Sequence, residues 1–126
     1  MNKLIIDLTG EKIFLTIITS NDIYNITKEN TKINYEKLTL IINDFLNSYH
    51  LKLRDINKIY LNRGPGSFAG IRNSLSIVKA FNLIHDIDYY CYSIQDFKGE
   101  KDIKHENIPE LCEKFKIEKN LINPIY

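Results

Sequence analysis

The sequence predicts an α/β fold with a mixed β-sheet, in the order β-β-β-α-β-α-β, followed by a short C-terminal helix. Three observations carry this prediction. Aliphatic and β-branched runs fill residues 1–30, the apolar spacing takes a helical period after Asn34, and a strand-like run then alternates with a second helical stretch. The length of 126 residues fits one domain.

The first three strands are expected at residues 3–8, 13–19 and 22–28. The first is a compact aliphatic run, the second is β-branched almost throughout, and the third alternates apolar and polar residues. Gly10 and Asn21 lie between these runs and suit hairpin turns, because both residue types accept positive φ. The segment is therefore predicted to form an antiparallel meander.

The remaining elements alternate helix and strand. A helix with one broad apolar face is expected from Asn34, its candidate N-cap, and a second over residues 69–85. Strands are expected over residues 56–62 and 87–93. Because a helix connects these two strands, they should be parallel and joined by a right-handed crossover.

The second helix has an unusually wide apolar arc. One stripe holds Ile71, Leu75, Val78 and Phe81, and a neighbouring stripe holds Ile77, Ala80 and Ile84. Packing on one face of a sheet needs a narrower arc. Two interpretations follow: the helix either presents a second surface to a partner or is buried at the centre of the fold.

Charged residues make up more than half of residues 98–119, and the first part of this segment reads as a solvated linker. A short helix is expected after it, with Asn107 as N-cap, Pro109 in the first turn and Glu110 completing a capping box. The last six residues are apolar enough to dock, but Pro124 argues against a central strand.

Composition excludes several classes of protein. The net charge of +1 lacks the basic excess of a protein that grips nucleic acid by itself. Cys91 and Cys112 fit no zinc spacing or disulfide framework, so they are expected to be reduced thiols. The opening MNKLIIDLTG resembles neither a secretory signal nor a membrane span, and the expected location is the cytoplasm.

The densest chemical signal is RGPGSFAGIR, residues 63–72, between a strand and a helix. It lacks the Lys-Ser/Thr of a phosphate-binding P-loop. Gly64, Gly66 and Ala69 formally match a dinucleotide fingerprint, but the acidic residue of that motif should follow the second strand, whereas Asp86 and Asp88 precede it. A sharp turn shaped for close packing is the favoured interpretation.

No catalytic constellation can be nominated. Ser67 lacks the G-x-S-x-G frame of a nucleophile elbow, and no metal-ligand spacing is present. His50, His85 and His105 occur singly, as surface or capping histidines do.

Asp7 is the one acidic residue in an aliphatic strand, and Thr9 follows it closely. Its carboxylate could bind phosphate or a metal-bound water in the loop after the strand. It could instead accept the N–H groups of that turn, which is the favoured interpretation.

This order of elements resembles the first lobe of the actin/Hsp70/sugar-kinase superfamily, a ribonuclease H-like fold. Within it, RGPGSFAGIR is similar to the R-G-P-G-S-F-T-G-(aliphatic)-R signature of the TsaB/YeaZ family. The matching signature positions are Arg63, Gly64, Pro65, Gly66, Ser67, Phe68, Gly70 and Arg72. The family usually has Thr at the positions of Ala69 and Leu8, and His-Ser at Asn34-Tyr35. The changes after Asp7 and at the helix start weaken any vestigial nucleotide loop at Asp7 and Thr9.

The resemblance implies a role in the bacterial machinery that installs threonylcarbamoyl on the adenosine next to the tRNA anticodon. The catalytic subunit TsaD holds a metal through an H-x-x-x-H helix, which this sequence lacks. The implied role is a non-catalytic subunit without a cofactor, which reaches tRNA only through its partner. Its helices would pair with those of TsaD, or of a second copy, in an assembly that can include the ATPase TsaE. The expected interface residues are Leu38, Ile42, Phe45, Ile71, Leu75 and Val78.

Family members usually carry a second lobe, and here only residues 98–126 follow the TsaB-like lobe at residues 1–97. Without an interlobe cleft, ATPase or kinase activity is not expected. A small nucleotide-binding enzyme that uses the Gly64-Pro65-Gly66 turn is the alternative. A peptidase is a third possibility, but no nucleophile and base pair supports it.

Overall fold

The computed structural model describes residues 1–126, and a five-stranded sheet forms its centre. The strands are β1 (Lys3–Asp7), β2 (Lys12–Ile18), β3 (Ile23–Glu29), β4 (Lys58–Asn62) and β5 (Asp88–Tyr92), in the order β3-β2-β1-β4-β5. The first three strands form an antiparallel meander, and β1, β4 and β5 run parallel. The mixed sheet and the element order predicted from the sequence are confirmed.

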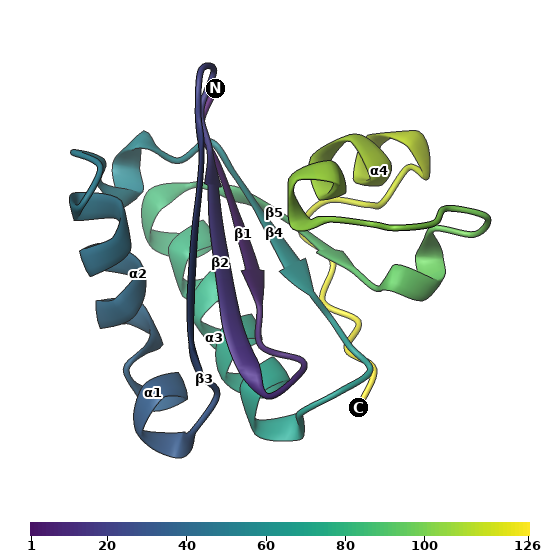
Figure 1. Ribbon diagram of the computed structural model, residues 1–126, viewed down its shortest axis with the longest axis horizontal. Helices are drawn as coiled ribbons and strands as arrows, with labels where there is room; N and C mark the ends of the chain where they lie inside the picture. Colours follow the sequence, from purple (N-terminus) through teal and green to yellow (C-terminus); the bar gives the residue numbers. More distant parts are fainter.

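Helices cover both faces of this sheet (Figure 1). The helices are α1 (Lys32–Glu36), α2 (Leu38–Asn47), α3 (Phe68–His85) and α4 (Ile108–Lys114), with single 3-10 turns at η1 (Leu53–Asp55), η2 (Ile94–Asp96) and η3 (His105–Asn107). α2 and α3 lie on one face, and the segment that contains α4 lies on the other.

The alternation of side chains along β1 divides the core in two. Leu4 and Ile6 point toward α2 and α3 and belong to a cluster of 21 buried apolar residues. Ile5 points the other way and packs with Tyr92 and Ile108 in a cluster of seven. Asp7 has the parity of Ile5, so its side chain lies on the face that α4 covers.

The first helix does not begin where the sequence prediction placed it. Thr31 is its N-cap, and its hydroxyl accepts a hydrogen bond from the Asn34 N–H. The Asn34 side chain instead donates to the Glu29 carbonyl at 2.8 Å. The backbone of Lys37 departs from helical geometry, with φ −102° and ψ 18°, and separates α1 from α2.

The expected cap of the last helix is also wrong. Asn107 has helical backbone angles and makes no side-chain hydrogen bond to the first turn of α4. Its side-chain oxygen accepts instead from the Lys104 N–H at 3.1 Å, which closes the preceding 3-10 turn. Pro109 lies in the first turn of α4, as predicted.

The C-terminal segment returns along β5 and then crosses the turn between β4 and α3. Lys119 forms an isolated bridge with Tyr90, and the Asn120 N–H donates to the Tyr89 carbonyl at 2.7 Å. Further on, the Ile125 N–H donates to the Arg63 carbonyl at 2.8 Å. None of the four helices combines the length and apolar character needed to cross a membrane.

Candidate functional site

The turn between β4 and α3 is held by hydrogen bonds at both ends. The Asn62 side-chain oxygen accepts from the Gly64 N–H at 3.0 Å. The Ser67 hydroxyl caps α3 by accepting from the Gly70 N–H at 3.2 Å, and the Ser67 N–H donates to the Thr9 carbonyl at 2.8 Å. The turn is therefore fixed to the loop that follows β1.

Two glycines of the turn allow this close approach. A Cβ at Gly66 would lie 2.2 Å from the Thr9 carbonyl oxygen, and one at Gly70 would lie 2.3 Å from that of Leu8. Both are far inside van der Waals contact with backbone atoms. These glycines pack against their own chain, as the close-packing interpretation predicts.

Arg63 connects the turn to two later segments. Its guanidinium contacts the Asp96 carboxylate at 2.7 and 3.4 Å and donates to the Asn123 carbonyl at 3.0 Å. The C-terminal tail lies so close that a Cβ at Gly64, where φ is +113°, would meet the Ile125 carbonyl oxygen at 1.9 Å. The first residues of the signature thus hold η2 and the tail in place.

Arg63→Lys should lower the free energy of unfolding by about 2 kcal/mol, because an ammonium cannot reproduce the forked contact with Asp96 and the bond to Asn123. Urea unfolding measures the effect, with Arg54→Lys as the control because Arg54 is exposed and makes no ion pair. Equal stability of the two variants would show that the fork contributes nothing.

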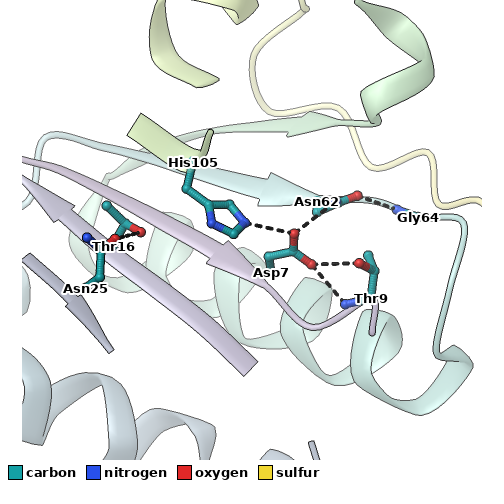
Figure 2. A network of polar contacts seen from close by, with 7 residues as sticks. All are labelled: Asp7, Thr9, Thr16, Asn25, Asn62, Gly64 and His105. Atoms are coloured by element: carbon teal, nitrogen blue, oxygen red, sulfur yellow. Dashed lines mark hydrogen bonds and ion pairs between the residues drawn. The ribbon is translucent and has the colours of Figure 1, made fainter. Parts of the chain in front are cut away.

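Asp7 is the centre of a polar cluster that draws on distant parts of the chain (Figure 2). Its carboxylate accepts from the Thr9 N–H at 3.0 Å, the Thr9 hydroxyl at 2.7 Å and the Asn62 amide at 3.1 Å. His105 Nε2 lies 3.1 Å from the same carboxylate, and its ring lies 5.1 Å from that of Phe14. Since a carboxylate only accepts, Nε2 must carry the hydrogen.

These contacts decide the ionisation of Asp7. Burial raises the pKa of its carboxyl, but the hydrogen bonds from His105, Thr9 and Asn62 outweigh burial and hold the pKa below its ordinary value. The carboxylate is thus charged, buried and surrounded by donors. Asp7 accepts the N–H of its own turn, which is the favoured interpretation from the sequence.

The polar linker expected around His105 therefore contains a contact that sequence reasoning missed. The histidine pairs with an aspartate 98 positions earlier and anchors the segment before α4 to the end of β1. Local sequence gave no signal of this contact, because His105 stands among charged residues typical of a solvated stretch.

The remaining nucleophiles and ligands are dispersed. Burial raises the pKa of the Cys91 and Cys112 thiols to about 12, so neither forms a thiolate at neutral pH. His50 and His85 are exposed and lie apart in the chain, His50 in the turn after α2 and His85 at the end of α3. No group of three His, Cys, Asp or Glu side chains is placed to hold a metal ion.

The six apolar residues expected at a partner interface lie in the core instead. Leu38, Ile42, Phe45, Ile71, Leu75 and Val78 are at most 6% exposed and pack toward the sheet. The most exposed large apolar side chains of α3 are Leu83 and Ile84, at 74% and 73%. Any partner surface on this helix must therefore use its outer face.

Two exposed side chains of the signature lie at the start of α3. The Phe68 ring is 56% exposed and packs on Tyr126, with ring centroids 4.5 Å apart. Arg72 is exposed one turn further along. These side chains bring the signature and the tail onto one surface.

Comparison with known proteins places this architecture in a family. Residues 28–113 match the family model described as TsaD, tRNA N6-adenosine threonylcarbamoyltransferase. The chain belongs to this family. The match extends from β3 to α4, so it includes the signature turn and most of both helical layers.

Relatives of the family confirm the resemblance to TsaB/YeaZ proteins. The chain is 33% identical over 69 residues to the tRNA threonylcarbamoyladenosine biosynthesis protein TsaB of Buchnera aphidicola subsp. Baizongia pistaciae (strain Bp), across 55% of this chain and 31% of that protein. YeaZ from Pseudomonas aeruginosa superposes with a TM-score of 0.67 at 18% identity, over 73% of this chain and 43% of YeaZ. The chain thus spans less than half of either relative.

A third similarity concerns the fold alone. RuvC of T. thermophilus, in a complex with a Holliday junction substrate, matches 78% of this chain and 68% of RuvC with a TM-score of 0.53 and 10% identity. Together with YeaZ it confirms the predicted actin- and ribonuclease H-like lobe.

Proposed function

We propose that this chain takes part in forming threonylcarbamoyladenosine in tRNA as a non-catalytic partner of the threonylcarbamoyltransferase. The observation that carries the proposal is the match of residues 28–113 to the TsaD family in a chain that lacks the H-x-x-x-H helix of the catalytic subunit. The Asp7 carboxylate, whose hydrogen bonds come from the chain itself, and the protonated thiols support a structural role.

The proposed contact is between α2 and α3 and the corresponding helices of the catalytic subunit. Leu83 and Ile84 are adjacent, large and almost three-quarters exposed, so they offer apolar surface to a partner. Beside them, a groove of about 500 Å³ runs between α2 and α3 and includes the side of Phe81.

The border of this groove is basic, with Lys52, Arg54 and His85 around its apolar floor. An apolar centre with a charged border is the usual anatomy of a protein interface. The partner should therefore offer an apolar helix face bordered by acidic residues. Because the chain's net charge is only +1, tRNA would be held mainly by the assembled complex, which can include the ATPase TsaE.

Ile84→Asp and Leu83→Asp are each expected to weaken binding to the host's catalytic subunit by about tenfold or more, because a carboxylate would be desolvated in the interface. Isothermal titration calorimetry on the full chain measures this. Ile94→Asp is the matched control, since Ile94 is 48% exposed and lies in η2, away from the groove.

Unchanged affinity in both helix variants would contradict the proposed surface. Sedimentation of the chain alone separates the second possibility, a homodimer through the same helices. Loss of self-association in Ile84→Asp, without any effect on the catalytic subunit, would assign this face to a second copy of the chain.

A further inference from the structure

A second hollow lies on the opposite face of the sheet, away from the groove between α2 and α3. It has a volume of about 390 Å³ and lies between α4 and the strand ends where β1 and β4 begin. Its chemistry comes from three lysines, two tyrosines and one glutamate, contributed by β1, β4, β5 and the end of α4: Lys3, Lys58, Lys116, Tyr60, Tyr90 and Glu113.

The three lysines have no anionic partner. Lys3 and Lys58 are direct register neighbours on the parallel strands β1 and β4, where like charges repel. Neither they nor Lys116 forms an ion pair, whereas nearby Lys119 pairs with Asp88 at 3.6 Å. The Lys58 ammonium lies 5.7 Å from the centre of the Tyr90 ring, so it is held over the hollow's aromatic side.

A tyrosine hydroxyl that lines the same hollow also has no partner within the chain. Tyr60 is only 4% exposed, its ring stacks on Tyr90 at 5.1 Å, and its hydroxyl makes no hydrogen bond within the chain. Burial raises the pKa of this hydroxyl well above its ordinary value, and the nearby Cys112 and Glu113 raise it further. The hydroxyl therefore stays protonated and can donate a hydrogen bond.

We propose that this hollow binds a phosphate group, through the ammonium groups of Lys3, Lys58 and Lys116 and the hydroxyl of Tyr60. Three cations against the single carboxylate of Glu113 leave an excess positive charge. This excess matches a terminal phosphate, which carries about −1.5 to −2 at neutral pH, or neighbouring backbone phosphates, which carry about −1 each. Lysine suits phosphate as a point charge, and a polar, open hollow admits oxygen atoms better than an apolar group. The phosphate can belong to a free nucleotide or to an RNA backbone.

This site is separate from the groove proposed for the catalytic subunit, so either proposal can fail alone. Calorimetric titrations of the full chain would use three probes: inorganic phosphate, AMP and unmodified tRNA. Two variants are compared with the wild type. One is a double variant that combines Lys3→Gln with Lys58→Gln, and the other is Tyr60→Phe, which removes only the hydroxyl. Lys28→Gln is the matched control, because Lys28 is an exposed strand lysine without an ion pair at the far edge of the sheet.

Saturable binding of at least one probe is expected, weakened about tenfold or more in the double variant and about threefold or more in Tyr60→Phe, with Lys28→Gln like the wild type. Binding of phosphate and AMP without tRNA identifies a nucleotide site. Binding of tRNA identifies backbone phosphates if the double variant changes its salt dependence. The slope of the logarithm of the binding constant against the logarithm of the salt concentration should then fall in magnitude by about 2.

Two outcomes would overturn the proposal. One is that none of the three probes saturates up to about 10 mM at low salt. The other is that Lys28→Gln weakens binding as much as the double variant does. Binding would then depend on the overall charge of the chain and not on this hollow. Thermal melts of every variant confirm that a lost signal is not lost folding.

Discussion

Gly70→Ala should lower the free energy of unfolding by about 3 kcal/mol, although alanine is the better helix former by about 1 kcal/mol. The added Cβ would lie 2.3 Å from the Leu8 carbonyl oxygen, which is a backbone atom and cannot move aside as a flexible side chain could. Leu8 is held by the Asn30 amide, which donates to that same carbonyl at 3.0 Å, and α3 is held by its Ser67 cap. Relief would require moving β1 or α3 as a whole.

Gly10→Ala is the matched control for this prediction. Gly10 lies in the same connection between β1 and β2, and an added Cβ there would meet no atom within 4 Å. Its substitution should change stability by less than about 0.5 kcal/mol. Urea unfolding measures the free energy of unfolding of both variants. Equal stabilities would contradict the prediction, because they would show that α3 and β1 accommodate the added Cβ without loss of stability.

Asp7→Asn should lower the free energy of unfolding by about 3 kcal/mol at pH 7. The amide replaces one of the two accepting oxygens by an NH2 group, so some of the donors around Asp7 would face another donor and lose their acceptor. In the folded chain the pKa of Asp7 lies below its ordinary value of 3.8. Its ionisation therefore stabilises the fold above pH 3.8 and ceases to do so as the pH falls through the folded pKa. The difference between wild type and variant should narrow below about pH 4.

Unfolding in urea at a series of pH values tests the sign of this dependence. Asp44→Asn serves as control, since Asp44 is exposed on α2 and its carboxylate has no partner in the chain. A stability difference for Asp7→Asn that stays constant from pH 7 to about pH 2.5 would show that the buried charge does not contribute.

Much of the fold could be predicted because its signals are local. An aliphatic run, a β-branched run and an alternating run located the first three strands, and the glycine turn located the join between β4 and α3. The predicted N-cap of α1 was wrong because two nearby polar residues can each fill that position. Thr31 caps α1 because the Asn34 side chain is bonded to Glu29, and this partner is set by the tertiary fold.

The candidate site could likewise be predicted only in part. The wide apolar arc of α3 was visible in the sequence, but its period does not say which apolar side meets the sheet. Leu75 and Val78 meet it, while Ile84 is left outside. The contact between Asp7 and His105 could not be predicted from the sequence, because it depends on where the charged segment after β5 lies against the end of β1.

Modification of tRNA with purified components tests the proposed role of the chain most directly. The host's catalytic subunit, its threonylcarbamoyl donor and unmodified tRNA are incubated with and without this chain, and threonylcarbamoyladenosine is measured by mass spectrometry of the digested tRNA. We expect no product from the chain alone. Product from the catalytic subunit should depend on the wild-type chain and fall about tenfold or more with Ile84→Asp. Full modification in the absence of the chain, or modification by the chain alone, would contradict the proposed role.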